Sequence, residues 1–341
     1  MAWTSRGFAP SGRMAAARSV PGGAEPASRA PSPPAPVAQF SHGMPVVRLQ
    51  DLARETRSTV LRVPLFSPAL GLRRWLALKL PPGYVPGSKL PLVYLFRGHH
   101  FEWISPREDA SRQNPLPNRF DEAVRAGTLP PAILVIPCMG SDERKMFSIA
   151  TNWACPQAVS PSRGMGLGRY EDYLMQDLIP AVESALGAVE PRRIAIGFSL
   201  GGLLSMQVAL RYPGFFSDVA SYDGSFFDDP PQQDDSILHY GIFDPIFGYP
   251  RDLDLVQQHS PLHLVSKVPL EDLQKTRFYV RSGPQFNEPN QSNYFRCKQV
   301  IEALEARGIH NPVDQVVPDG RHDWHTADLF GMDMLGRILA S

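Results

Sequence analysis

The chain has 341 residues, of which 34 are basic and 34 acidic, so its formal net charge at pH 7 is zero. This balance gives no sign of a nucleic acid or an anionic membrane surface as partner, and no apolar run approaches the roughly 18–20 residues that span a bilayer. Three widely spaced cysteines, Cys138, Cys155 and Cys297, provide neither a disulfide framework nor a Cys-x-x-Cys metal motif, and we expect small buried hydrophobic residues.

The first 45 residues differ in composition from the rest of the chain. Up to residue 39 they are rich in Ala, Pro, Ser and Gly, and Glu25 is the one acidic side chain among several arginines. Such a segment cannot bury enough apolar surface to order itself, which predicts a disordered tail over 1–45 and a folded domain over 46–341. The tail resembles an organellar transit peptide in composition but lacks the apolar core of a secretory signal, so we expect a cytoplasmic protein.

Beyond the tail, short apolar runs alternate with amphipathic helical patterns, which predicts an α/β protein with a mostly parallel sheet and helices on both faces. The first two strands are expected to form an antiparallel pair. The predicted strands are 58–66, 73–80, 90–96, 132–137, 193–196, 217–222, 277–281 and 313–317. The predicted helices are 118–126 with Asn118 as cap, 170–186 with a kink at Pro180, 200–212, 294–307 and 325–339. The irregular segment 223–269, rich in Asp, Pro and aromatic residues, predicts an insertion above the sheet.

The pentapeptide Gly197-Phe198-Ser199-Leu200-Gly201 joins a predicted strand to a predicted helix. Gly-x-Ser-x-Gly in that setting is typical of a nucleophile elbow, in which a strained turn exposes the serine hydroxyl above the sheet. A Cβ atom at either flanking position would collide with the neighbouring strand or helix, which explains the two glycines. Ser199 is therefore the candidate nucleophile, and the N–H of Leu200 at the helix N-terminus is a candidate oxyanion donor.

A serine nucleophile needs a histidine base and an acid that orients this base. In hydrolases with such an elbow the order along the chain is Ser, acid, His, and the histidine follows the last strand. His322 lies in that loop, whereas His325 already belongs to the final helix. Glu288 is the only carboxylate in the loop after strand 277–281 and is the predicted acid, while Asp223, after the preceding strand, is the alternative.

The loop after strand 90–96 contains Gly98 and His99, and the N–H of His99 is the second candidate oxyanion donor. His99 and His100 together also raise the question of a metal ion. Adjacent histidines point in different directions, and no Asp or Glu-x-x-His partner has suitable spacing, so we expect neither a metal site nor a cofactor.

Aromatic side chains lie in several segments that could reach the carboxyl edge of the sheet. Trp103, Trp153 and Tyr222 are the candidates for substrate contact, and packing in the core is the competing interpretation for each. If they face the site, an aromatic or carbohydrate-linked acyl group would suit it.

The combined motifs resemble the esterase D-like "putative esterase" family of the α/β-hydrolases, which includes feruloyl and acetyl-xylan esterases, enterobactin esterases, S-formylglutathione hydrolases and mycolyltransferases. The resemblance runs from residue 57 to residue 339 and rests on the sequences Leu80-Pro81-Pro82-Gly83-Tyr84, Leu92-Val93-Tyr94-Leu95-Phe96-Arg97-Gly98, Tyr170-Glu171-Asp172-Tyr173-Leu174, Leu178-Ile179-Pro180, Ile194-Ala195-Ile196-Gly197-Phe198-Ser199-Leu200-Gly201-Gly202 and His322-Asp323-Trp324. It implies an α/β-hydrolase fold, with Ser199 as nucleophile, His322 as base, and His99 and Leu200 as oxyanion donors.

Two positions depart from the pattern of that family. Arg97 stands where His or a similar residue is usual, and Phe286 stands where the acidic residue is usual. If Glu288 takes over as the acid, the chain is a serine carboxylic-ester hydrolase that works through an acyl-enzyme on a small-molecule or carbohydrate-linked ester. The same site could instead transfer the acyl group to an alcohol or sugar. The replacement at Phe286 also leaves open a non-catalytic, hydrolase-like binding protein.

Overall fold

A computed structural model of the protein describes residues 60–187, 191–287 and 292–341. The chain divides into two units, Met1–Pro36 and Val37–Ser341, and all described residues lie in the second. The tail predicted over 1–45 lies outside the described residues, and so does Glu288, the predicted acid.

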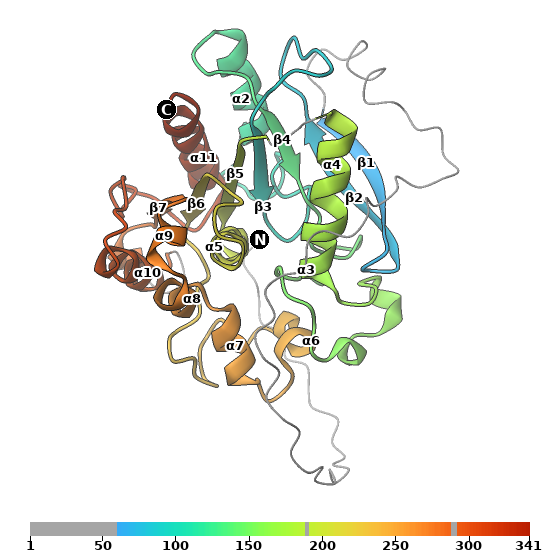
Figure 1. Ribbon diagram of the computed structural model, residues 1–341, viewed down its shortest axis with the longest axis vertical. Coiled ribbons are helices and arrows are strands. Elements are labelled where there is room, and N and C mark those ends of the chain that lie inside the picture. The colour runs from blue at the N-terminus through green and yellow to red at the C-terminus, as the bar shows by residue number, and fades with distance from the viewer. Residues whose placement is uncertain (1–59, 188–190, 288–291) are drawn as a thin grey trace. The chain divides into compact units, whose positions relative to one another are not determined.

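One seven-stranded sheet forms the centre of the described part, in the order β1-β2-β4-β3-β5-β6-β7 (Figure 1). The strands are β1 (Val60–Ser67), β2 (Leu72–Lys79), β3 (Leu92–Phe96), β4 (Ile133–Ile136), β5 (Arg193–Phe198), β6 (Asp218–Tyr222) and β7 (Arg277–Arg281). β2 is antiparallel to both β1 and β4, whereas β4, β3, β5, β6 and β7 run parallel. This arrangement confirms the prediction of a mostly parallel sheet that begins with an antiparallel pair.

Side chains of the central strands alternate between the two faces of the sheet, as the strand period of two requires. In β3, Leu92, Tyr94 and Phe96 pack into one hydrophobic core, while Val93 and Leu95 pack into the other. All five side chains are fully buried. A parallel strand covered on both faces has no exposed side, which explains why its sequence is continuously apolar.

Helices cover both faces of this sheet (Figure 1). α4, α5 and α10 contribute to the first core, and α2 and α11 contribute to the second. The helices are α2 (Leu116–Arg125), α3 (Tyr170–Asp172), α4 (Ile179–Leu186), α5 (Leu200–Arg211), α6 (Asp244–Phe247), α7 (Leu253–His259), α8 (Pro261–Lys267), α9 (Leu270–Leu273), α10 (Tyr294–Ala306) and α11 (Trp324–Leu339). None of the helices described here combines the length and the apolar character that a membrane crossing requires.

The predicted helix 170–186 is interrupted rather than continuous. A π-helical segment, Tyr173–Leu178, separates α3 from α4. Pro180 has no N–H to donate to the carbonyl four residues before it, which removes one α-helical hydrogen bond at this point. The wider π turn ends at Leu178, two residues before the proline, so the expected irregularity takes this form.

The start of α2 was predicted wrongly, at Asn118. The helix begins at Leu116, and the preceding Pro115 provides no side-chain cap. The N–H of Leu116 instead donates to Oδ1 of Asp328 at 2.9 Å, from a residue 212 positions later in the chain. A cap that comes from another helix leaves no local signal in the sequence.

The predicted strand 313–317 is also wrong. In its place a single parallel bridge joins Ser282 to Val316. The amide of Asn311 bonds both the N–H and the C=O of Val280, each at 3.0 Å, so a side chain replaces strand pairing along part of β7. Pro312 and Pro318 flank the segment and have no N–H to give to a ladder, which disfavours a regular strand there.

The segment 223–269, which we expected to be an insertion above the sheet, contains the short helices α6, α7 and α8. A 3₁₀ turn at Gly241–Phe243 precedes α6. Two further 3₁₀ turns, Pro156–Ala158 and Pro161–Arg163, lie in the long connection between β4 and α3.

The strand registers bring the loops with the predicted site residues to one edge of the sheet. Phe96 at the end of β3 pairs with Gly197, Phe198 at the end of β5 pairs with Tyr222, and Tyr222 at the end of β6 pairs with Arg281. The loops that follow these parallel strands therefore start side by side, where open α/β sheets place their binding sites.

Candidate active site

Ser199 lies in a strained turn between β5 and α5. Its φ is +56° and its ψ is −117°, a backbone conformation that side-chain-bearing residues rarely adopt. The turn is also crowded, because a Cβ atom on Gly197 would lie 1.9 Å from the carbonyl oxygen of Gly201, and one on Gly201 would lie 1.9 Å from that of Phe96. The structure therefore has the geometry that the Gly-x-Ser-x-Gly sequence predicts.

A hydrogen-bonded chain runs from this serine through a histidine to an aspartate. The Oγ of Ser199 lies 2.9 Å from Nε2 of His322, and Nδ1 of His322 lies 2.5 Å from Oδ2 of Asp223. The Asp223 side chain is fully buried, while 27% of the His322 side chain is exposed. The three residues come from the loops after β5, β6 and the segment before α11, in the order Ser, Asp, His along the chain.

The position of Asp223 is fixed by its surroundings. Its φ is +51°, and its N–H donates to the carbonyl of Arg281 at 2.8 Å. Oδ1, the oxygen that does not face His322, accepts the N–H of Asn293 at 2.7 Å, and Nδ2 of Asn293 donates to the Asp223 carbonyl at 2.9 Å. With both carboxylate oxygens bonded, the carboxylate is held toward the imidazole.

Nδ1 of His322 bonds Asp223, the alternative acid of the sequence analysis. Glu288, the predicted acid, lies outside the described residues. The usual acid of this family follows β7, where Phe286 stands here, whereas Asp223 follows β6, one strand closer to the serine. The signal in the sequence is the Asp223-Gly224 dipeptide, a tight-turn sequence immediately after a buried strand.

A second polar group in that turn went unnoticed in the sequence. The Oγ of Ser225 lies 3.3 Å from the Oγ of Ser199, and the N–H of Ser225 donates to the Ser199 carbonyl at 3.1 Å. Asp223 and Ser225, on either side of Gly224, thus both contact the residues of the elbow site. A Cβ on Gly224 would lie 2.4 Å from the Phe226 ring.

The loop that carries His322 is anchored on both sides. The hydroxyl of Tyr222 donates to the carbonyl of Arg321 at 2.8 Å, and Oδ1 of Asp323 caps α11 by accepting the N–H of Thr326 at 2.8 Å. The imidazole also packs on the Phe198 ring, with centroids 4.8 Å apart. His325, the competing histidine, lies exposed in the first turn of α11.

The two candidate oxyanion donors differ in whether their N–H already has a hydrogen-bond acceptor. Leu200 is the first residue of α5, so its N–H has no acceptor within the helix. The N–H of His99, in contrast, donates to Oε2 of Glu102 at 2.5 Å. Oε1 of Glu102 accepts Nε of Arg97 at 3.2 Å, and Nη1 of Arg97 reaches the Phe198 carbonyl at 3.3 Å. Burial raises the pKa of the Glu102 carboxyl, which Arg97 and the His99 N–H partly offset.

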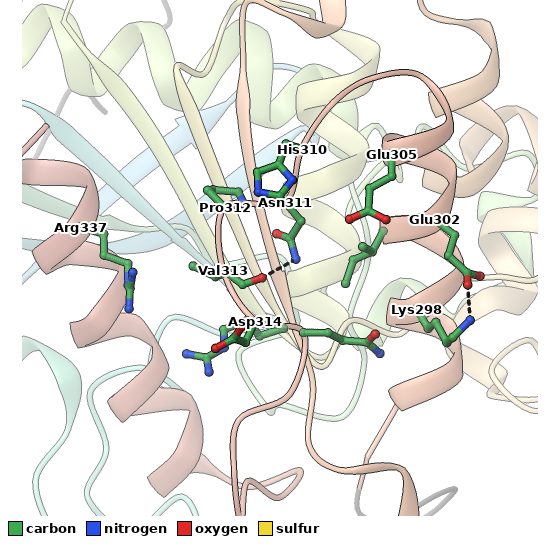
Figure 2. Close-up of a pocket in the computed structure, with 12 residues that line it drawn as sticks. Lys298, Glu302, Glu305, His310, Asn311, Pro312, Val313, Asp314 and Arg337 are labelled. Carbon is green, nitrogen blue, oxygen red and sulfur yellow. Dashed lines mark hydrogen bonds and ion pairs between the residues drawn. The ribbon is translucent and has the colours of Figure 1, made fainter.

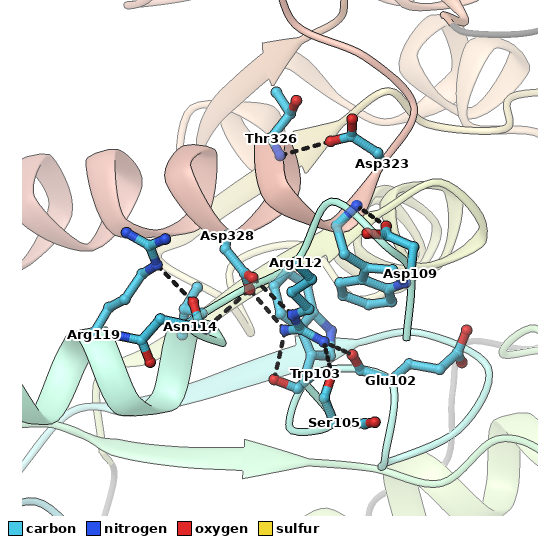
Figure 3. Close-up of polar contacts among 12 residues, drawn as sticks. Glu102, Trp103, Ser105, Asp109, Arg112, Asn114, Arg119, Asp323, Thr326 and Asp328 are labelled. Atoms are coloured by element: carbon cyan, nitrogen blue, oxygen red, sulfur yellow. Dashed lines mark hydrogen bonds and ion pairs between the residues drawn. The ribbon is translucent and has the colours of Figure 1, made fainter. Parts of the chain in front are cut away.

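A buried ion pair holds the loop that follows β3 (Figure 3). Both carboxylate oxygens of Asp328 accept the Arg112 guanidinium at 2.7 Å. The same guanidinium donates to the carbonyls of Glu102, Trp103 and Ser105. This pair fixes the loop with Glu102 against α11, the helix that follows the His322 loop.

The Asp109 carboxylate extends this network to the His322 loop. Its Oδ2 accepts the N–H of Trp324, the first residue of α11, at 2.6 Å (Figure 3). The loop after β3 and the loop with His322 are thus tied together by polar contacts.

The three aromatic residues predicted to contact substrate are buried instead. Trp103 and Tyr222 are fully inaccessible, and Trp153 is 7% exposed. Nε1 of Trp103 donates to the Phe96 carbonyl at 3.0 Å, and Nε1 of Trp153 donates to Oγ of Ser148 at 2.8 Å. Their polar groups are bonded inside the chain, so we assign them to packing, the competing interpretation, rather than to substrate contact.

A cavity of about 550 Å³ lies away from the serine, next to β7, α10 and α11 (Figure 2). Its walls carry charges of both signs, including Arg281, Lys298, Glu302, Asp314 and Arg337. Ser199, His322 and Asp223 do not line it. With its mixed charge and no link to the elbow, this cavity has no part in the candidate active site.

The sheet order, the elbow and the hydrogen-bonded Ser–His–Asp chain define an α/β-hydrolase. The family described as "Putative esterase" matches residues 67–334, and the chain belongs to this Esterase family. The resemblance noted from the sequence motifs is thus confirmed.

The chain is similar to one named protein in sequence and to several solved structures in fold. The chain is 32% identical over 164 residues to the uncharacterized protein YbbA of Bacillus subtilis (strain 168), across 46% of this chain and 58% of YbbA, less than two thirds of that relative. A ferulic acid esterase superposes with a TM-score of 0.63 at 19% identity, covering 84% of this chain and 99% of its own. An S-formylglutathione hydrolase from Agrobacterium tumefaciens superposes with a TM-score of 0.58 at 15% identity, over 83% and 96%.

Proposed function

We propose that the protein is a serine carboxylic-ester hydrolase in which Ser199, His322 and Asp223 act as nucleophile, base and acid. The observation that carries the proposal is the continuous hydrogen-bonded chain from Ser199 Oγ through both nitrogens of His322 to Asp223. Asp223 accepts the Nδ1 proton and so leaves Nε2 free to take the serine proton. Asp223 here takes the role that the sequence assigned to Glu288, and it removes the reason for a non-catalytic protein.

The reaction runs through an acyl-enzyme. Ser199 Oγ attacks the ester carbonyl carbon while its proton passes to Nε2 of His322, and the carbonyl oxygen becomes an oxyanion. The Leu200 N–H at the start of α5 stabilises this charge, together with the helix dipole. His322 then gives the proton to the departing alcohol. Water attacks the acyl-enzyme by the same steps in reverse order and releases the acid.

The substrate class that we propose is a small carboxylic ester. A ferulic acid esterase and an S-formylglutathione hydrolase share the fold, and for this reason a screen starts with feruloyl esters and small acyl thioesters beside short-chain acyl esters. Product analysis with an added acceptor alcohol distinguishes hydrolysis from acyl transfer, because only a transferase forms a new ester in preference to the free acid.

Covalent labelling tests the nucleophile directly. A fluorophosphonate should label the wild-type protein once, and the Ser199→Ala variant should remain unlabelled and lose esterase activity. Folded wild-type protein that stays unlabelled would contradict the assignment and favour a binding protein instead.

Two matched variants test the acid. Asp223→Asn should keep the geometry but place the wrong tautomer at His322, and should lower kcat by about 10³- to 10⁴-fold. Glu288→Gln is the control and should leave kcat close to that of the wild type. The opposite result would return the role of acid to Glu288.

A further inference from the structure

Three side chains with metal-binding donor atoms meet beneath the loop that follows β3. His99 and His100 come directly after β3, and Cys138 comes directly after β4, the neighbouring parallel strand. One donor atom from each lies within 4.8 Å of the other two. All three residues are buried, with His99 1% exposed and the other two fully inaccessible. The pairing of β3 with β4 therefore supplies a third donor that the spacing along the sequence does not reveal.

The imidazole nitrogens in this cluster lack partners. Among the described residues, Nε2 of His99 and both ring nitrogens of His100 form no hydrogen bond, although all three atoms are buried. The Cys138 thiol makes a long contact, 3.5 Å, with the Gly140 carbonyl and a hydrogen bond with the backbone of His100. Buried polar atoms are nearly always satisfied, so unpartnered imidazole nitrogens next to a buried thiol indicate a bound ligand.

The charged groups near the cluster carry both signs. Arg62 and Arg144 act on both rings, and Arg74 acts on the His99 ring and on the Cys138 thiol. On the acidic side, Glu102 accepts the His99 N–H, Glu108 pairs with Arg144, and Asp142 acts on the thiol.

We propose that His99, His100 and Cys138 form a binding site for one cuprous ion. Two imidazoles and a thiolate are a soft donor set, which selects Cu⁺ or Zn²⁺ over hard cations. Cu⁺ and a Cys138 thiolate cancel in charge, so a bound cuprous ion leaves the buried cluster neutral, whereas Zn²⁺ would leave it with a net positive charge. The expectation of no metal here rested on adjacent rings pointing apart and on the lack of a partner at suitable spacing. In the structure the rings stack, with centroids 4.3 Å and planes 29° apart, and Cys138 comes from the loop after the neighbouring strand.

Binding requires a small rearrangement, and the contacts of the rings permit it. The His100 ring can turn its lone pair toward Cys138 without breaking a hydrogen bond, because it forms none in the described structure. Nδ1 of His99 accepts the Phe101 N–H at 3.2 Å, so its proton lies on Nε2. When Nε2 ligates, this proton moves to Nδ1 and the hydrogen bond from Phe101 is lost. The Cys138 thiol gives up its proton to bind as a thiolate. One proton is released for each Cu⁺ bound.

A competition titration tests the site. Apo protein is titrated with Cu⁺ without oxygen, against a chromophoric Cu⁺ chelator, and should retain one equivalent with a thiolate-to-copper absorption band. Cys138→Ala and His100→Ala should weaken binding by more than the roughly 10- to 100-fold that loss of a supporting contact costs. Cys297→Ala, which removes another buried cysteine in α10, is the matched control and should bind as the wild type does.

Two further measurements separate the site from its alternatives. The proton balance predicts an affinity that rises about tenfold per pH unit below the thiol pKa. Ser199→Ala should bind Cu⁺ like the wild type, so the result does not depend on the proposed esterase chemistry. Circular dichroism shows whether each variant is folded. Unchanged Cu⁺ affinity in folded Cys138→Ala protein, or tight binding of Zn²⁺ alone, would overturn the proposal.

Discussion

At the scale of single residues, the turn after β6 concentrates the polar groups around Ser199. Asp223 reaches His322, and Ser225, two positions later, reaches the nucleophile itself. This is possible because Asp223 adopts a positive φ and Gly224 leaves room for the Phe226 ring. Aspartate tolerates that conformation better than most residues, so the turn can carry the acid directly.

Glu102 is the residue whose charge we expect to limit catalysis. Its carboxylate holds the His99 N–H, the second candidate oxyanion donor, at 2.5 Å. A substrate oxyanion must compete with this negative charge. Glu102→Gln keeps an acceptor but removes the charge, and we expect kcat to rise by about threefold to tenfold, part of the 10²–10³ that a complete oxyanion donor is worth. Steady-state kinetics on the ester that the substrate screen finds to be hydrolysed fastest measures this change in kcat.

The control for this variant is Glu108→Gln, which removes a carboxylate from the same loop, where Glu108 pairs with Arg144. It should leave kcat unchanged. A fall in kcat for Glu102→Gln would instead mean that the Arg97–Glu102 pair positions the His99 N–H for the reaction.

At the scale of elements, one carboxylate joins three parts of the fold. Asp328 in α11 accepts the guanidinium of Arg112 and the first N–H of α2 at Leu116. Arg112 in turn holds the carbonyls of the loop after β3. Since the side chains of Arg112 and Asp328 are 0% and 1% exposed, the pair cannot be replaced by water when one partner is lost.

We therefore expect Asp328→Asn to lower the free energy of unfolding by about 3–5 kcal/mol, because it leaves a buried guanidinium without its counter-charge. Urea unfolding at neutral pH measures this loss. Asp333→Asn is the matched control on the same helix. Asp333 is 36% exposed and pairs with Arg337, 52% exposed, and with Arg281, 14% exposed. Because water reaches this carboxylate and the Arg281 guanidinium also donates to the Val316 carbonyl, its loss should cost clearly less, about 1 kcal/mol. Equal effects of the two substitutions would show that the buried pair does not stabilise the fold.

Elements with a complete local signal could be predicted from the sequence. β7 was predicted at its observed bounds, and β3 and β4 within one or two residues, because continuous apolar runs bounded by Pro or Gly mark buried parallel strands. The start of α2 and the missing strand at 313–317 depend on Asp328 and Asn311, which act from distant positions. Such tertiary contacts override local propensity and are invisible to it.

At the scale of the whole molecule, the site residues also fall into two groups. A local sequence signal locates some of them, and only the tertiary structure places the others. Ser199 and His322, the proposed nucleophile and base, could be proposed from the sequence because a motif and a fixed chain order locate them. The acid was left between Glu288 and Asp223, since two strands of the parallel sheet, β6 and β7, end at the same edge and each is followed by a carboxylate. Only the sheet order and the path of the loops decide which one reaches the imidazole. The Cys138 cluster was missed for the same reason.

Stability in acid is a property of the whole molecule, and it follows from three buried histidines. Burial lowers the pKa of His99 to about 4, and those of His100 and His259 to about 3. In the unfolded chain each regains its usual value near 6.5. Between these values the unfolded state binds protons that the folded state does not. The free energy of unfolding is thus at its full value above about pH 6.5 and falls as the pH decreases toward 4.

Replacing one of these histidines tests this argument. His259 bonds Thr151 and Gln207 through Nδ1, and His259→Gln keeps a polar side chain there but cannot take up a proton. Urea unfolding from about pH 7 to about pH 5 should show a smaller dependence of stability on pH than in the wild type. The difference in slope approaches about 1.4 kcal/mol per pH unit, the value for one proton, below about pH 6, where the unfolded histidine is mostly protonated. His325→Gln, on an exposed histidine, should leave the slope unchanged. An equal slope in His259→Gln would mean that His259 is already protonated in the folded protein, and that burial does not set its charge.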